Sequence, residues 1–221
     1  VHESSDGEPR YVPTLLADRS VGIYLSSMIS AALYARERSG HGQSIEVPMF
    51  ETLSQFVLGD HMAGLSFDPA LGGPFYDRLI SKNRHPYKTE DGYLCVLIYN
   101  DAHWLAFLEI IGKPQVFFED QRFSSHSARA ANIDFVCGFV AKELKNKTTA
   151  EWLTLFEKVD VPAVRMNSIE SLIDDPHLDD VGFFSIKEHP SEGRLRIINP
   201  PETWSETKSY VSGFAPKLSQ H

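Results

Sequence analysis

Apolar residues recur every three or four positions in the stretch that follows Asp18, and this spacing is typical of a helix. The periodic positions are Val21, Leu25, Met28, Ile29, Ala32 and Leu33. Cationic Arg36 and Arg38 stand near the end of the stretch and Gly40 follows, which together indicate a helix C-terminus. The pattern therefore predicts a helix of about five turns that is amphipathic to largely buried.

Two further elements are predicted directly after this helix. Residues 44–47 alternate in polarity and are bounded by Gly42 and Pro48, which predicts a short strand. Residues 49–65 carry a wide apolar face, which predicts a second helix. A helix followed by a strand across a glycine turn is typical of an α/β unit.

Beyond residue 66 the pattern changes to a loop and then to shorter elements. Residues 67–74 are rich in glycine and proline, which predicts a loop or a domain boundary. Residues 84–89 and 93–98 flank Asp91-Gly92 and predict a hairpin. The remaining predicted elements are helices over 101–111, 127–144, 149–158 and 169–173, an edge strand over 161–165, and two pairing strands over 183–188 and 194–198.

Asp18 stands immediately before the first predicted helix, so its carboxylate is a candidate N-cap for otherwise unpaired backbone N–H groups. These donors and the helix dipole favour the charged carboxylate. Asp18 would then act as an acceptor or a nucleophile at neutral pH. The residues alone leave open the alternative that Asp18 caps the helix and takes no part in chemistry.

Composition restricts the class of protein. The 221 residues are 42% hydrophobic and have a formal net charge of −9, with no basic cluster, so we expect a soluble globular protein that does not bind nucleic acid. No run approaches the about 18 apolar residues of a membrane span, and no signal-peptide pattern is present, so we expect a cytoplasmic location and no membrane contact. Cys95 and Cys137 lie in apolar surroundings, which predicts two buried thiols and no disulfide.

Most candidate chemical motifs are absent from the sequence. The nine histidines show no metal-ligand spacing, so we predict no metal site, and no nucleophile elbow supports a hydrolase. Gly72-Gly73 lacks the flanking residues of a phosphate loop and is read as a turn or as a flexible flap near a site. Trp104 and Trp152 stand among leucines at helical spacing, which predicts core positions.

Short motifs spread along the whole chain resemble the class III CoA-transferases of the CaiB/BaiF type. This family includes formyl-CoA transferase, carnitine CoA-transferase and α-methylacyl-CoA racemase. The motifs are Ala17-Asp18, 31–33, 36–43, 45–49, Arg84-His85-Pro86-Tyr87, Asp91-Gly92, Asp101 with Trp104, Asp120-Gln121-Arg122-Phe123, Glu151-Trp152, Val161-Pro162-Ala163, Asp175-Pro176-His177-Leu178, His189-Pro190-Ser191-Glu192-Gly193 and Ala215-Pro216-Lys217-Leu218.

The resemblance implies an α/β fold with part of a Rossmann-like large domain, a smaller α+β domain, and an interlocked homodimer. It implies that residues 1–68 belong to the large domain, 69–165 form the small domain, and 166–221 return to pack on the large domain. Asp18 matches the catalytic nucleophile of the transferases, and Gly72 and Gly73 match a glycine-rich substrate loop. The implied reaction moves CoA from an acyl-CoA to a small carboxylic acid through an aspartyl-CoA thioester, without a permanently bound cofactor.

The resemblance also leaves two alternatives. The racemases of the family pair the matching aspartate with an upstream histidine as an acid and a base, and His2 is too close in sequence to match it. The residues that supply much of the sheet and most CoA contacts in the family have no counterpart here, so we expect a carboxy-terminal portion. The alternatives are therefore α-methylacyl-CoA racemase activity and a catalytically incomplete chain that only assembles.

Overall fold

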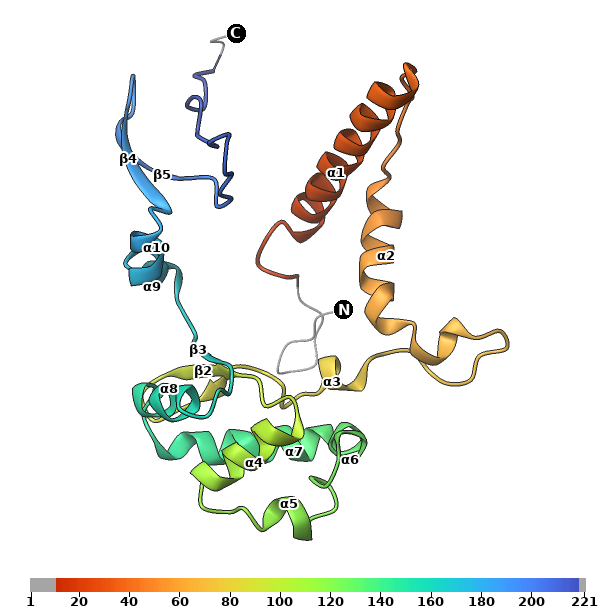
Figure 1. Ribbon diagram of the computed structural model, residues 1–221, viewed down its shortest axis with the longest axis vertical. Coiled ribbons are helices and arrows are strands. Elements are labelled where there is room, and N and C mark those ends of the chain that lie inside the picture. The colour runs from red at the N-terminus through yellow and green to blue at the C-terminus, as the bar shows by residue number, and fades with distance from the viewer. Residues whose placement is uncertain (1–10, 219–221) are drawn as a thin grey trace. The chain divides into compact units, whose positions relative to one another are not determined.

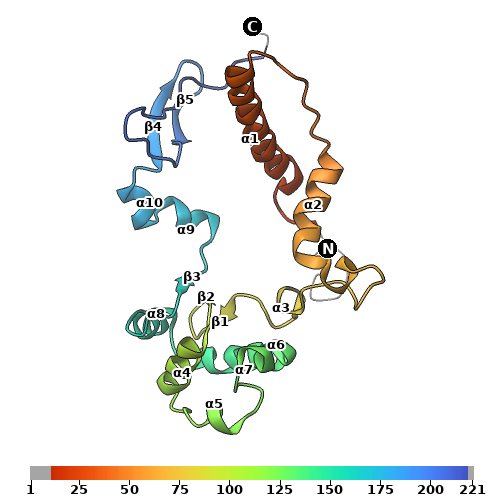
Figure 2. The ribbon, with the colours of Figure 1, turned by 45° about the vertical axis from the view of Figure 1, so that its right-hand side comes forward.

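The computed structural model describes residues 11–218 and mixes helices with short strands (Figures 1 and 2). The backbone contacts divide the chain into two compact units, the first formed by 1–84 with 129–135 and the second by 85–128 with 136–221.

The first unit contains two long helices that pack against one another (Figure 1). Helix α1 spans Leu16–Ser39 and ends at Gly40, which adopts a left-handed conformation (φ 74°) and donates its N–H to the Arg36 carbonyl. Helix α2 spans Met49–His61 and is followed by the short helix η1, Ala63–Ser66. The unit also holds α3, Asp77–Ile80. The predicted helices after Asp18 and from Met49 are confirmed, although the second ends earlier than predicted.

The strand predicted over 44–47 is wrong, because these residues form no strand. A strand needs a neighbouring strand to pair with its N–H and C=O groups, and the described residues supply none beside this stretch. The burial predicted for α1 is also wrong. Val21 is the only hydrophobic side chain of α1 that is buried, while Ile23 and Tyr34 on the same helix are 75% and 66% exposed.

The second unit holds all the strands in the described part of the chain, in two antiparallel sheets. The first sheet has the order β1-β2-β3, in which Tyr87 pairs with Leu94 and Cys95 pairs with Val164. In the other sheet β4 pairs with β5, from Phe184 opposite Ile198 to His189 opposite Gly193. The strands are β1 Tyr87–Lys88, β2 Tyr93–Val96, β3 Ala163–Arg165, β4 Phe184–His189 and β5 Gly193–Ile198.

These pairings confirm both predicted hairpins and the edge position of β3. The helices that follow α3 are α4 Asp101–Ile110, α5 Val116–Glu119, α6 His126–Ala131, α7 Ile133–Glu143, η2 Leu144–Asn146, α8 Thr149–Glu157, α9 Ile169–Ile173 and α10 Pro176–Asp180. The sequence did not predict α10, where Asp175 caps a helix whose first residue is Pro176.

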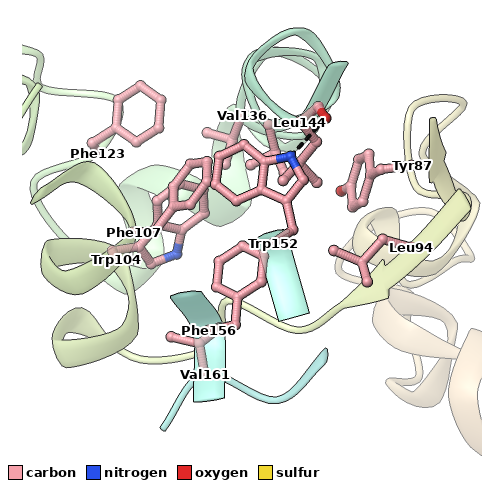
Figure 3. Packing of buried hydrophobic residues seen from close by; sticks show 11 residues of the cluster. Tyr87, Leu94, Trp104, Phe107, Phe123, Val136, Leu144, Trp152, Phe156 and Val161 are labelled. Carbon is pink, nitrogen blue, oxygen red and sulfur yellow. Dashed lines mark hydrogen bonds between the residues drawn. The ribbon is translucent and has the colours of Figure 1, made fainter. Parts of the chain in front are cut away.

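The hydrophobic core lies in the second unit, where α4, α7 and α8 pack beside the first sheet (Figure 3). Trp152 stacks on Phe156 with ring centroids 5.5 Å apart, and its Nε1 donates to the Leu144 carbonyl at 2.8 Å. Phe107 is fully buried and stacks on Phe156. The core positions predicted for Trp104 and Trp152 are confirmed. Cys137 is buried and Cys95 half-buried, and both are free thiols.

Candidate active site

Asp18 is the third residue of α1 and therefore does not occupy the N-cap position predicted for it. The helix begins at Leu16, three residues earlier than an N-cap at Asp18 would place it, and the N-cap residue is Leu15. No side chain caps this end, and the Leu16 N–H bonds to the Thr14 carbonyl at 2.8 Å. Asp18 instead provides the acidic side chain of the first turn, where the helix dipole still favours an anion.

The Asp18 side chain is exposed, so its carboxylate is accessible from solvent. A carboxylate in the first helical turn that is not enclosed by the fold has room for a reacting group to approach it. The arrangement of Asp18 in this unit is thus compatible with both readings of the sequence, a nucleophile and a residue that only favours the helix start.

Gly72 and Gly73 lie in the loop that runs from η1 to α3, in the same unit as Asp18. The two long helices of this unit run in opposite directions, so the start of α1 and the end of α2 point the same way (Figures 1 and 2). The glycine loop follows the end of α2. The fold therefore brings Asp18 and the two glycines toward the same end of the α1 and α2 pair.

The base of this loop is closed by His61, a residue that the sequence reasoning did not single out. The His61 carbonyl accepts from the Phe75 N–H at 2.8 Å, and the Nδ1 atom of the His61 imidazole accepts from the Tyr76 N–H at 3.3 Å. The same imidazole meets the Phe75 ring edge-on, with centroids 5.9 Å apart. Because these contacts join residues 14 and 15 positions apart, a local pattern could not have revealed them.

A cavity of about 390 Å³ lies between α1 and α2 but includes neither Asp18 nor the two glycines. Its lining comes from Tyr24 and Met28 of α1, residues 45–48, and Glu51, Thr52 and Gln55 of α2. This cavity is therefore not part of the candidate active site.

The carboxylates with shifted pKa values in the second unit fix the structure of that unit. Hydrogen bonds from the backbone and the hydroxyl of Thr149 lower the pKa of Asp91, and those from Thr148 lower the pKa of Glu151. The bidentate pair with the Arg122 guanidinium lowers the pKa of Asp120. Each of these carboxylates has a structural partner, and none belongs to the unit that carries Asp18.

The described residues contain neither a metal-binding cluster nor a membrane-spanning helix. Within residues 11–218, no three His, Cys, Asp or Glu side chains gather closely enough to hold a metal ion. Over the same range, no helix combines the length and the apolar run that crossing a membrane requires. His2, which the sequence reasoning set aside as a racemase histidine, lies outside the described residues.

Comparison with known proteins identifies relatives over the whole chain. This chain is 29% identical to the succinate--glutarate CoA-transferase of Agrobacterium fabrum, over 98% of its own length and 54% of that protein. It is 32% identical to the acetyl-CoA:oxalate CoA-transferase of Acetobacter aceti, over 71% of this chain and 40% of that protein. The chain thus spans about half the length of the curated relatives it matches.

The fold is similar to that of a solved structure. The crystal structure of a mutant of Rv3272 from Mycobacterium tuberculosis matches with a TM-score of 0.78 and 21% identity, over 100% of this chain and 57% of that one. At this identity the likeness shows the fold alone. The model of CoA-transferase family III matches residues 1–221. The chain therefore belongs to CoA-transferase family III, as its motifs indicated.

Proposed function

We propose that this chain carries the nucleophile of an enzyme that transfers CoA from an acyl-CoA donor to a small carboxylic acid. The observation that carries the proposal is the family match over residues 1–221, in a chain that exposes Asp18 in the first turn of α1. The names of the two relatives above support the substrate class, since each pairs CoA transfer with a carboxylic acid.

Asp18 acts as the nucleophile in the first half of the proposed reaction. One oxygen of its carboxylate attacks the thioester carbonyl of the donor, the C–S bond breaks, and CoA leaves as a thiolate. The product on the protein is a mixed anhydride between Asp18 and the donor acyl group. The CoA thiolate then attacks the Asp18 carbonyl, which releases the donor carboxylate and leaves an aspartyl-CoA thioester.

The second half reverses these steps with the acceptor. The acceptor carboxylate attacks the Asp18 carbonyl, which releases the CoA thiolate and forms a new mixed anhydride. The thiolate attacks the acceptor carbonyl, so that the acceptor leaves as its CoA thioester and Asp18 regains its carboxylate. No metal, redox cofactor or external base is needed, because each carboxylate enters as an anion and each step conserves charge.

Gly72 and Gly73 belong in this proposal to a loop that covers the reacting groups. Supporting this role, the loop follows the end of α2 that points the same way as the start of α1, where Asp18 lies (Figure 2). Two glycines offer little side-chain bulk against a bound thioester, so the backbone can approach it closely. A covering loop would also keep water from the anhydride and thioester intermediates.

The large Rossmann-like domain, the interlocked homodimer and the three-part division at residues 68 and 165 are also proposals. Exposed apolar side chains on the helices of the first unit support the large domain and the homodimer. Ile23 and Tyr34 of α1 and Phe50 of α2 are more than three-fifths exposed, as is expected of side chains that a further domain or a second chain would cover. A cytoplasmic location is likewise a proposal.

The experiment that tests the proposal compares Asp18→Asn with Glu37→Gln, a change of an exposed carboxylate near the other end of the same helix. The intact protein is incubated with succinyl-CoA and glutarate, and glutaryl-CoA is measured. We expect Asp18→Asn to lower transfer by at least about 10³-fold and Glu37→Gln to leave it unchanged. Undiminished transfer in Asp18→Asn would refute the role of Asp18. Deuterium entering the α-carbon of a 2-methylacyl-CoA without any transfer would instead indicate racemase chemistry.

A further inference from the structure

The glycine loop folds back onto η1 through a crossing of two backbone segments. The Gly64 N–H donates to the Gly73 carbonyl at 3.1 Å, and the Leu71 N–H donates to the Gly64 carbonyl at 3.1 Å. Gly64 is therefore bonded through both of its backbone groups to the segment that contains Gly72 and Gly73. With the two hydrogen bonds at His61, this crossing closes the loop on itself.

The crossing requires glycine at position 64. A Cβ atom on Gly64 would lie 2.5 Å from the Cα atom of Gly72 and 2.6 Å from its N and C atoms. Because all three atoms belong to the backbone, the loop itself would have to move. A Cβ atom on Gly72 would meet only the Gly64 Cα atom, at an ordinary 3.7 Å. The close approach therefore excludes a side chain at position 64 but leaves space for a Cβ atom at position 72.

Strained backbone occurs on both sides of this crossing. Ala63 has a φ of 42° and Phe75 a φ of 86°, and both are in the region that side chains with a Cβ atom avoid. Residues held in such conformations cluster at active sites and ligand clamps, where the surrounding structure fixes them. Here they flank the residues that the crossing and the His61 contacts hold in place.

We propose that Gly64 is a positioning residue for CoA transfer: its backbone holds Gly72 and Gly73 in a closed loop at the end of the helix pair where Asp18 lies. The inference rests on the proposed function, because the value of a fixed loop depends on a reaction at Asp18. Gly64 does not touch the reacting atoms in this proposal. It acts through the shape that the crossing gives to the loop.

The test substitutes Gly64→Ala and uses Gly59→Ala as its matched control. Gly59 lies in α2, five residues earlier, and a Cβ atom there has no neighbour within 4 Å. Two readouts are taken on the intact protein: hydrogen exchange at the amides of residues 64, 71, 73, 75 and 76, and steady-state kinetics with succinyl-CoA and glutarate.

In Gly64→Ala we expect the amides of residues 64 and 71 to lose protection and kcat/KM to fall about 10- to 100-fold, as for a reacting group misplaced by about 1 Å. Hydrolysis of succinyl-CoA should rise relative to transfer, because an open loop admits water, and a purely structural defect would not change this ratio. Gly59→Ala should match the unsubstituted protein in both readouts.

The outcomes separate this inference from the proposed function. Loss of amide protection in Gly64→Ala with unchanged kinetics and an unchanged hydrolysis ratio would overturn the positioning role and leave transfer at Asp18 intact. Absence of transfer in the unsubstituted protein would refute the proposed function. If Gly64→Ala does not fold, hydrogen exchange of the unsubstituted protein still tests the inference. Unprotected amides at Gly64 and Leu71 would show that the crossing is not formed and would overturn the positioning role.

Discussion

Asp91 and Thr149 join the β1 and β2 hairpin to the start of α8. The Oδ1 atom of Asp91 accepts from the Thr149 N–H at 2.7 Å and from the Thr149 hydroxyl at 2.8 Å. The hydroxyl of Thr89 lies 2.7 Å from that of Thr149, and both threonines are buried. A single carboxylate therefore satisfies an unpaired N–H of the helix and fixes the turn of the hairpin.

Asp91→Asn should destabilise the second unit, because an amide accepts more weakly than a carboxylate and its NH₂ group can face the Thr149 donors. We expect the urea midpoint of the protein to fall. Glu90→Gln is the control, because it alters the neighbouring exposed carboxylate of the same turn. The hydrogen bond that Glu90 makes to the Lys147 carbonyl comes from its backbone N–H, which this substitution retains. Equal midpoints for Asp91→Asn and the unsubstituted protein would show that the carboxylate adds nothing.

Lowering the pH should remove the contribution of the Asp91 carboxylate to the stability of the folded protein. The hydrogen bonds from Thr149 lower the pKa of Asp91 in the folded protein below its ordinary value near 4. The stabilisation is therefore complete above the pKa of the unfolded chain and is lost as the pH falls through the lower folded pKa. The midpoint difference between the unsubstituted protein and Asp91→Asn should shrink as the pH is lowered from about 6 toward about 3. A difference that grows on acidification contradicts this account.

Phe107→Ala should strongly destabilise the core. Phe107 is fully buried and contacts Trp104, Trp152 and Phe156, so removal of its ring leaves a cavity among aromatic neighbours (Figure 3). We expect a loss of about 3–5 kcal/mol in the free energy of unfolding measured with urea. Phe118→Ala removes the same ring from a site that is 75% exposed and should cost no more than about 0.5 kcal/mol.

The hydrogen bonds of His189 predict one tautomer of its imidazole. Its Nδ1 atom faces the backbone N–H groups of Ser191 and Glu192 at 3.1 and 3.2 Å, and these groups can only donate. Nδ1 must therefore accept, and the proton belongs on Nε2, which faces the Ala215 carbonyl at 3.4 Å. The ring also meets Phe214 edge-on, with centroids 4.8 Å apart.

Nitrogen-15 spectra of the neutral imidazole should show the proton of His189 on Nε2. His189→Asn retains an acceptor near the Nδ1 position and loses the donor to Ala215. The amides of Phe214 and Ala215 should then exchange about fivefold faster, the factor that corresponds to one hydrogen bond of about 1 kcal/mol. A proton on Nδ1, or unchanged exchange in the variant, would rule out this arrangement.

Elements stabilised by neighbouring residues were predictable from the sequence. The Asp91-Gly92 turn predicts the first hairpin, and Thr148 and Glu151 form the capping box that starts α8. Predictions failed where the local structure depends on contacts with residues that are distant in the sequence. Residues 44–47 have the strand pattern, but no strand in the described part of the chain pairs with them. The crossing of Gly64 and Gly72 is likewise a contact between distant backbone segments, which periodicity does not record.

The candidate active site was predictable only in part, for the same reason. The motif around Asp18 is local, so the sequence indicates both the residue and the helix that carries it. The closed shape of the glycine loop depends on His61 and Gly64 in the preceding helices, which the sequence pattern treats as ordinary helix positions. The family match is the basis for the proposed chemistry, which neither the hydrophobic pattern nor the structure of the first unit indicates.

Direct trapping of the intermediate at Asp18 tests the central claim. The intact protein is incubated with succinyl-CoA in the absence of an acceptor, treated with hydroxylamine, digested, and analysed by peptide mass spectrometry. The account predicts a hydroxamate on Asp18 that requires succinyl-CoA and is absent in Asp18→Asn. Efficient CoA transfer without any modification of Asp18 would contradict it.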